Sequence, residues 1–137
     1  MPAFVVDSAA LSRNIEKLRR FTAAQIIAVV KGNGYGLGLV PYAHFLTAQG
    51  VALLAVSTAA EAAALRDAGI TAELLMLSST ALPEEIAALL TRDVILTVGS
   101  ADAARAVSDV AAARGVTARI HVKLDTGMGR YGFLPQE

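Results

Sequence analysis

The hydrophobic residues of this 137-residue chain fall into five short runs separated by longer, alanine-rich segments. The runs span residues 26–31, 53–57, 73–77, 94–98 and 119–125. They are rich in leucine and β-branched residues, and most are continuously apolar, which is typical of buried strands in a parallel sheet. Their recurring interval, roughly 20 to 27 residues, predicts successive βα units.

The segments between these runs carry the signals that begin and end helices. Thr58 and Glu61 have the spacing of a capping box, in which the glutamate reaches back to the amide of the threonine. Pro83 suits the first position of a helix, and Ser100 is expected to open another helix that ends at Gly115. The pattern therefore predicts an α/β protein whose helices either cover both faces of a parallel sheet or surround a barrel.

A separate piece precedes the first βα unit. Residues 4–6 have the character of a short strand, and a helix capped by Asp7 or Ser8 follows. The apolar face of this helix consists of Leu11, Ile15 and Leu18. We therefore divide the chain into a leading strand and helix at residues 1–22 and successive βα units at residues 26–137.

Composition narrows the class of protein. The chain has 12 Lys and Arg against 12 Asp and Glu without a run of like charge, so it offers no electrostatic footprint for nucleic acid or an anionic membrane. It has no apolar run of about 18 residues that could cross a membrane. The absence of cysteine excludes a disulfide scaffold and a Cys nucleophile, and two histidines give a metal site little support. The first residues lack the basic segment of a secretory signal, so we expect a cytoplasmic protein.

Lysine is scarce, which makes its positions informative. Lys17 lies on the polar face of the first predicted helix, whereas Lys31 and Lys123 lie in apolar strands. Lys31 ends its strand, and active-site groups of parallel α/β proteins project from the carboxyl ends of strands. Partial desolvation there favours the free amine, which can form a Schiff base or take up a proton. The alternative is a lysine whose stem packs at the sheet edge while its ammonium reaches water.

A glycine-rich segment, residues 32–38, follows Lys31. A dinucleotide-binding fingerprint needs glycines at positions i, i+2 and i+5, and the third falls on Leu37 or Leu39 here. A P-loop needs its lysine after the glycines, whereas Lys31 precedes them. We interpret the segment as a small-residue turn that lets a bulky group approach the backbone, with Tyr35 four residues beyond the lysine.

In the last predicted strand, apolar and polar side chains alternate, so they fall on opposite faces. One face consists of Ile120, Val122 and Leu124, and the other consists of His121, Lys123 and Asp125. On the inward face of a buried strand, a lysine needs an anion or a neutralising modification. Arg130, just beyond the strand, is available for such a network. The alternative is a salt bridge of Lys123 with Asp125 or a nearby carboxylate that only fixes the strand.

Two separated segments carry a resemblance to one known family. VVKGNGYGLG at residues 29–38 and HVKLDTGMGRYGF at residues 121–133 together resemble the alanine racemase family, and residues 5–14 are similar to its amino-terminal strand and helix. The resemblance implies a fold-type III enzyme dependent on pyridoxal 5′-phosphate. It also implies a parallel (β/α)8 TIM barrel.

The resemblance assigns expected roles to single residues. Lys31 holds the cofactor and is one of two acid/base groups at the substrate Cα. Tyr35 lies beside the cofactor phosphate, Leu77 matches a residue of the pocket wall, and Arg130 approaches the cofactor's phenolic oxygen and the substrate. Lys123 is similar to a lysine that is often carbamylated in the family, which turns a buried cation into an anion able to orient Arg130.

The chain is short for the architecture that the resemblance implies. Because an eight-stranded barrel takes about 250 residues, we expect residues 1–137 to supply only about its first five strands, without the carboxy-terminal half-barrel and β domain. The family's second acid/base is a tyrosine from the β domain of the partner subunit, which implies a homodimer in the full-length protein. We therefore expect the isolated chain to be inactive and its parent to be an isomerase of D-alanine biosynthesis, with a small amino acid as substrate and no metal.

Alternatives stay open for the substrate and the activity. The commoner family pattern differs from this sequence at Gly32, Gly34, Leu37 and Tyr131. A racemase of another amino acid, or a D-amino-acid aldolase or deaminase, would use the same lysine. A non-catalytic cofactor-binding or structural module is the alternative from a different class.

Overall fold

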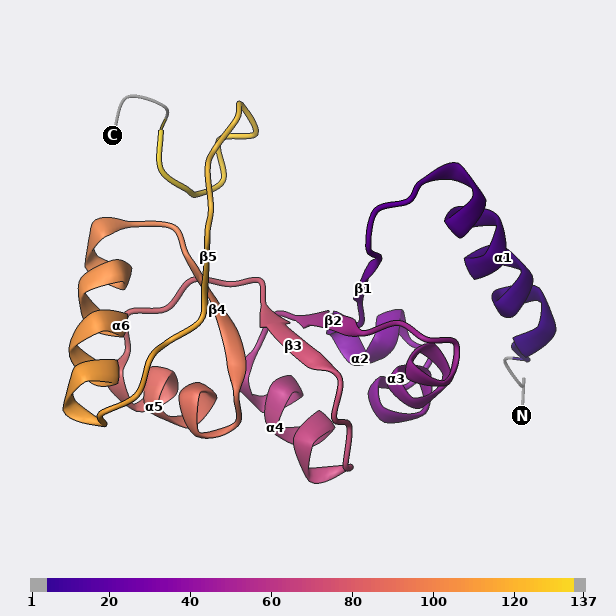
Figure 1. Ribbon diagram of the computed structural model, residues 1–137, viewed down its shortest axis with the longest axis horizontal. Coiled ribbons are helices and arrows are strands. Elements are labelled where there is room, and N and C mark those ends of the chain that lie inside the picture. Colours follow the sequence, from indigo (N-terminus) through magenta and orange to yellow (C-terminus); the bar gives the residue numbers. More distant parts are fainter. Residues whose placement is uncertain (1–4, 135–137) are drawn as a thin grey trace.

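The computed structural model describes residues 5–134, which contain five strands in one parallel sheet. The order of the strands across the sheet is their order along the chain (Figure 1). They are β1 (Ile27–Val29), β2 (Leu53–Val56), β3 (Glu73–Met76), β4 (Val94–Val98) and β5 (Ile120–Val122). Each strand lies inside a predicted run, and the parallel α/β class is confirmed.

The described range has six helical segments, of which the first precedes the sheet and the others connect its strands. They are α1 (Ser8–Phe21), α2 (Lys31–Tyr35), α3 (Leu39–Ala48), α4 (Ala59–Asp67), α5 (Pro83–Thr91) and α6 (Ala101–Ala113). The predicted starts are confirmed, since Thr58 and Glu61 form the capping box of α4, Pro83 begins α5, and the Ser100 side chain caps α6. None of the described helices is long and apolar enough to cross a membrane.

The two faces of the sheet have different neighbours. Leu54, Leu74 and Leu96 belong to the main core, which the sheet forms with residues of α3, α4, α5 and α6. The residues next to them in the strands form a second, smaller cluster on the opposite face, consisting of Ala55, Leu75 and Ile95. Among the described residues, the partly buried hydrophobic side chains that pack against this cluster come from β1, from β2 and from the residue after β3: Val29, Leu53 and Leu77. Figure 1 shows α3 to α6 along one side of the sheet.

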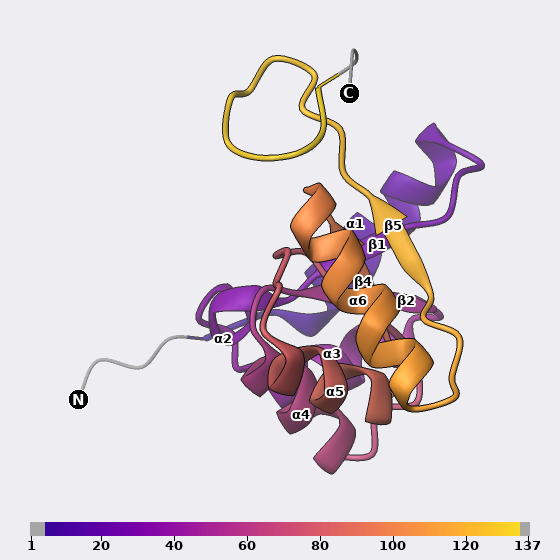
Figure 2. The same cartoon turned by 90° about the vertical axis from the view of Figure 1, so that its left-hand side faces the viewer.

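This arrangement decides between the two architectures that the sequence leaves open. A doubly wound sheet carries helices on both faces, whereas barrel strands follow chain order and have helices on the outer face only. The described chain has the second arrangement and forms a partial, open barrel. Figure 2 shows the loop after β5 raised above the sheet, away from α4 and α5.

β5 is an edge strand in the described part of the chain. Ile120 and Val122 are 44% and 59% exposed, so the expectation of a buried last strand is wrong here. The reason is that β4 is the sheet neighbour of β5 and no described strand pairs with its other edge. His121 is exposed as well.

The leading segment differs in part from its prediction. Asp7 caps α1 by accepting hydrogen bonds from two amides of the first turn. Of the predicted apolar face, Ile15 is buried but Leu18 is 54% exposed. Val5 and Val6 belong to no strand, since no strand of the described sheet lies beside them to pair with, and Phe4 lies outside the described residues.

Candidate active site

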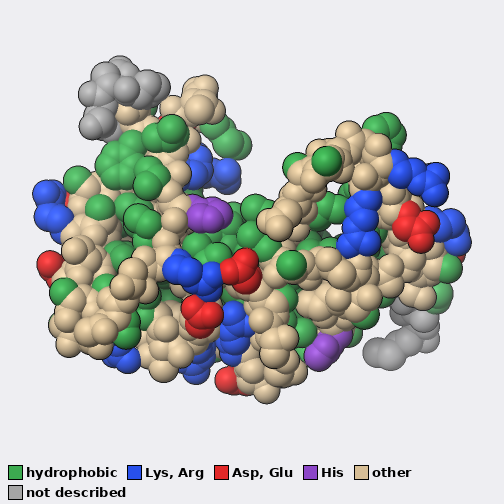
Figure 3. All heavy atoms as spheres, in the orientation of Figure 1, with side chains coloured by type: hydrophobic (Ala, Val, Ile, Leu, Met, Phe, Trp, Pro, Cys, Tyr) green, Lys and Arg blue, Asp and Glu red, His purple; other side chains and the backbone are tan. Residues whose placement is uncertain are grey.

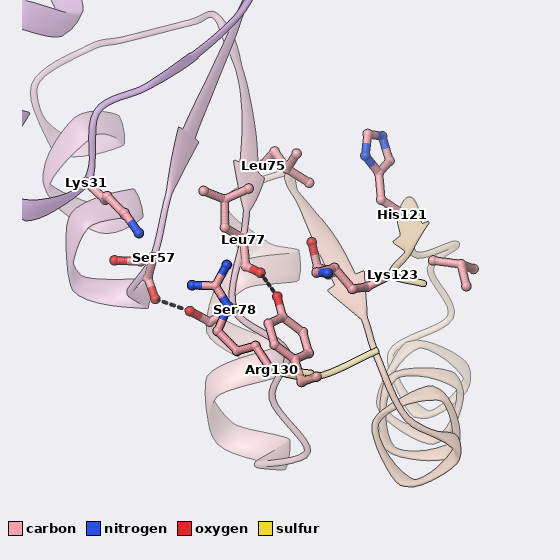
Figure 4. Close-up of a pocket in the computed structure, with 11 residues that line it drawn as sticks. Lys31, Ser57, Leu75, Leu77, Ser78, His121, Lys123 and Arg130 are labelled. Carbon is pink, nitrogen blue, oxygen red and sulfur yellow. Dashed lines mark hydrogen bonds between the residues drawn. The ribbon is translucent and has the colours of Figure 1, made fainter. Parts of the chain in front are cut away.

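A pocket of about 410 Å³ lies on the face of the sheet that carries no helices, at the carboxyl ends of the strands (Figure 4). Its polar lining residues come from every strand end and from the loop after β5: Lys31, Ser57, Ser78, Thr97, His121, Lys123, Arg130 and Tyr131. Figure 3 shows hydrophobic side chains on the floor of a hollow between two raised ends of the molecule. Barrel proteins place their active sites at this end of the strands.

Lys31 begins a left-handed turn directly after β1. Val30 still pairs with β2, because its N–H donates to a β2 carbonyl oxygen at 2.8 Å. Gly32, Asn33 and Gly34 then take φ values of 63°, 55° and 62°, so α2 is a left-handed turn rather than an ordinary α-helix. Glycine takes this conformation without steric cost. The turn explains why β1 ends before the predicted limit and why glycines follow the lysine.

Two side chains from outside the strands hold this turn. The Asn33 side-chain oxygen accepts from the amide of Leu39 at 2.9 Å. One carboxylate oxygen of Glu61 accepts from the amide of Gly32 at 2.7 Å, and the other accepts from the amide of Ser57 at 2.9 Å. Burial raises the pKa of Glu61, but these amides outweigh it and hold the pKa below its usual value. The ends of β1 and β2 are therefore joined through one carboxylate.

A closed loop carries Arg130. At its base, Phe133 N–H donates to the carbonyl oxygen of Lys123 at 2.8 Å, and Asp125 N–H donates to the carbonyl oxygen of Phe133 at 2.9 Å. Inside it, the Asp125 carboxylate accepts from two glycine amides, each at 3.0 Å. These bonds lower the pKa of Asp125. The loop is thus held at both ends, and it presents Arg130 to the pocket.

Tyr131 connects this loop to the sheet. Its hydroxyl donates a hydrogen bond to the main-chain carbonyl oxygen of Leu77. Its ring lies against Gly99, where an added Cβ would come within 2.7 Å of the ring. The Lys123 ammonium lies 5.1 Å from the ring centroid, within the range of a cation–π interaction. Tyr131, the neighbour of Arg130 in the sequence, therefore holds the loop against the ends of β3 and β4.

The pocket is cationic. Lys31, Lys123 and Arg130 line it, and no aspartate or glutamate is among its lining residues in the described chain. The alternative salt bridge between Lys123 and Asp125 is absent from the ion pairs of residues 5–134. A cluster of cations without carboxylates suits an anionic ligand.

The structure brings most of the predicted site residues together. This pocket is lined by Lys31, Leu77, Lys123 and Arg130. Figure 4 shows the side chains of Lys31, from the turn after β1, and Arg130, from the loop after β5, reaching into it. Tyr35 does not line it and is 64% exposed.

Sequence reasoning missed several polar residues of the pocket. Ser57 and Ser78 follow the ends of β2 and β3, and the rule that active-site groups lie at carboxyl strand ends could have found both. Thr97, within β4, is the buried polar residue among those described. Glu61 was identified only as part of a helix cap.

The comparison with protein families decides the family. Residues 6–137 match the family described as "Alanine racemase, N-terminal domain". The chain belongs to this family. The match spans the lysine turn, the strands and the arginine loop.

Individual alanine racemases are similar to the chain in sequence and in fold. The alanine racemase of Methanococcus maripaludis is 40% identical over 134 residues, which are 96% of this chain and 36% of that protein. The solved structure of the alanine racemase of Clostridium difficile has 34% sequence identity and a TM-score of 0.85. The matched region is 93% of this chain and 34% of the Clostridium difficile chain. The chain therefore spans about a third of the length of these relatives.

A solved relative with another name has the same fold. The histidine racemase of Leuconostoc mesenteroides has 27% sequence identity and a TM-score of 0.85. The matched region is 92% of this chain and 34% of the histidine racemase chain.

Proposed function

We propose that the intact protein is a pyridoxal-phosphate-dependent alanine racemase, and that residues 1–137 form the amino-terminal part of its barrel. The observation that carries the proposal is the convergence of Lys31 and Arg130 on one cationic pocket at the carboxyl ends of the strands. The membership in the alanine racemase family supplies the reaction class.

The chemistry of the pocket fits this cofactor. Pyridoxal phosphate carries a phosphate and a phenolic oxygen, which are anionic, and an aldehyde, which combines with a primary amine. Lys31 and Lys123 supply primary amines, and Arg130 supplies a planar donor for an anionic oxygen. We assign the attachment to Lys31, because it projects from a turn that is held on both sides by hydrogen bonds.

The proposed reaction moves a proton at the substrate Cα. When bound, pyridoxal phosphate withdraws electrons from the Cα of an attached amino acid and makes the Cα proton acidic. Lys31 takes this proton from one face or returns it to that face. Arg130 holds the phenolic oxygen and the substrate, while Leu77 forms a wall of the pocket. Tyr35 extends from the turn of Lys31, and we assign it to the cofactor phosphate.

A racemase needs a second acid/base on the opposite face of Cα. By its family resemblance this group is a tyrosine of the partner subunit, so the proposed active form is a homodimer. The 137 residues alone are then expected not to racemise alanine. A cytoplasmic location also stays a prediction.

The proposal is tested by racemisation. Intact protein supplied with pyridoxal phosphate is expected to convert L-alanine to D-alanine and back, measured by chiral chromatography. Lys31→Ala is expected to lose this activity, whereas Lys17→Ala, on the exposed face of α1, keeps it. Activity that survives Lys31→Ala contradicts the assignment of the acid/base.

A second candidate function is a racemase of another amino acid. The similarity to a histidine racemase favours it, because the same fold serves a different substrate there. A panel of L-amino acids tested with the same protein separates the two, since the preferred substrate is the one with the highest kcat/KM. A protein that stays colourless with the cofactor and acts on none of them is instead a non-catalytic module.

A further inference from the structure

We propose that Glu61 is a positioning residue for Lys31, because its carboxylate ties the turn that carries the lysine to the end of the neighbouring strand. The inference rests on the proposed function insofar as Lys31 is the amine that holds the cofactor. It adds a residue that lies outside the pocket and acts on the pocket through the main chain.

Both oxygens of the Glu61 carboxylate are engaged. Oε1 accepts from Gly32 N–H at 2.7 Å. Oε2 accepts from Ser57 N–H at 2.9 Å, from Thr58 N–H at 3.2 Å and from the Ser57 hydroxyl at 3.2 Å. Hydrogen bonds to a carboxylate are stronger than those to a neutral acceptor.

The contact with Gly32 goes beyond helix capping. A capping box requires only that the glutamate accept from the amide of its own N-cap residue, which is Thr58 here. Gly32 is 29 residues away in the sequence and belongs to a different βα unit. The carboxylate therefore serves two elements, the start of α4 and the turn after β1.

The donors around Glu61 require an acceptor on both sides. In the described chain, the hydrogen bonds to its carboxylate come from N–H and O–H groups. A glutamine offers one acceptor oxygen and one NH₂ group, so on one side an N–H group would face another donor. An aspartate is one methylene shorter and cannot reach both sides from the same helix position.

The bond to Gly32 N–H acts directly on the lysine. The peptide group between Lys31 and Gly32 is planar, so fixing its N–H restrains the ψ angle of Lys31 and with it the backbone from which the lysine side chain projects. The turn needs such support because Asn33 and Tyr35 hold positive φ values of 55° and 53°, which cost L-residues energy. Without the carboxylate, the lysine end of the pocket would sample other backbone conformations.

The test compares two variants of the intact protein. Glu61→Gln removes the two-sided acceptor with nearly the same volume. Thr58→Ala removes the other half of the same capping box, the bond from Glu61 N–H to the Thr58 hydroxyl, and leaves the Glu61 carboxylate in place. It is therefore a matched control for weakening the start of α4.

Two measurements are made on each variant. Hydrogen–deuterium exchange of the Gly32 amide, which needs no cofactor, is expected to accelerate about ten- to a hundredfold in Glu61→Gln and to stay unchanged in Thr58→Ala. The rate at which added pyridoxal phosphate becomes reducible onto Lys31 by borohydride is expected to fall about tenfold or more in Glu61→Gln only.

The outcomes separate this inference from the proposed function. If the wild-type protein never attaches the cofactor at Lys31, the proposed function fails, and amide exchange alone still decides whether Glu61 holds the turn. If the wild-type protein and Glu61→Gln attach it at the same rate, the inference is overturned while the function stands. An equal effect of Thr58→Ala and Glu61→Gln on both measurements also overturns it, since the cause would then be the helix start.

Discussion

The hydroxyl of Tyr131 is hydrogen-bonded to the main-chain carbonyl oxygen of Leu77. This bond joins the loop after β5 to the residue that follows β3, two segments separated by 54 positions in the sequence. Leu77, Tyr131 and its neighbour Arg130 all line the same pocket. This hydroxyl therefore adds to the contacts at the base of the loop that hold Arg130 relative to the sheet.

Tyr131→Phe is expected to loosen the arginine loop. It keeps the ring against Gly99 and removes only the donor, which lowers the free energy of unfolding by about 1 kcal/mol. It is also expected to weaken binding of pyridoxal phosphate, since Arg130 is held less firmly. Urea denaturation and a spectroscopic titration measure the two effects. Tyr42→Phe, outside the pocket, is the control, and a Tyr131→Phe protein that matches the wild type in both measurements contradicts the account.

Gly132→Ala is expected to disrupt the same loop for a steric reason. An added Cβ would lie 2.8 Å from the backbone nitrogen of Asp125 and 2.9 Å from the carbonyl carbon of Leu124, and φ is +130°. We expect a loss of about 2 kcal/mol or more in the free energy of unfolding. Gly129→Ala is the comparison, because its φ is +68° and no atom lies within 4 Å, so it is expected to cost about 1 kcal/mol. Equal losses in the two variants would show that contact with the base of the loop is unimportant.

Stability is expected to fall on acidification. The folded pKa values of Glu61 and Asp125 lie below their ordinary values of 4.5 and 3.8. Their contribution is therefore complete above those ordinary values and is lost as the pH falls through the lower folded values. Urea denaturation between about pH 5 and pH 3 measures this loss. Glu61→Gln is expected to flatten the profile, and a variant profile parallel to that of the wild type would falsify the assignment to Glu61.

Lys123 is expected to be carbamylated in the intact protein. It shares the pocket with Lys31 and Arg130, and no carboxylate lines that pocket in the described chain. Conversion of its amine to a carbamate replaces a repelling cation with an anion that attracts Arg130. A crystal structure of the intact protein is expected to show the added carboxyl atoms on the Lys123 nitrogen. Refined density that ends at this nitrogen contradicts the prediction.

The sequence predicted the fold where local signals act over one helix or strand. The apolar run at residues 94–98 became β4 with both ends as predicted, and the Thr58–Glu61 spacing became a capping box. The run at residues 26–31 gave a shorter strand because the chain enters a left-handed turn, a backbone state that apolar periodicity does not encode. The burial of β5 was mispredicted, because burial depends on a neighbouring strand that the described residues do not include.

In the candidate site, too, features set by local sequence were predicted and features set by contacts between distant residues were not. Lys31 and Arg130 could be predicted because each follows the end of a strand within a recognisable motif. Two hydrogen bonds of the site could not be predicted from a local pattern, because each joins residues that are distant in the sequence. One joins Tyr131 to Leu77, and the other joins Gly32 to Glu61. The place of Tyr35 beside the cofactor phosphate comes from the family resemblance and stays a prediction, because the exposed Tyr35 side chain does not line this pocket in the described chain.

The central claim is that Lys31 is the amine that holds pyridoxal phosphate. Borohydride reduction of the intact protein with the cofactor, followed by digestion and peptide mass spectrometry, identifies the modified lysine directly. The account predicts one cofactor-derived mass increment on the peptide containing Lys31, and none on Lys17 or Lys123. Labelling of Lys123 in place of Lys31, or no labelling of any lysine, would contradict it.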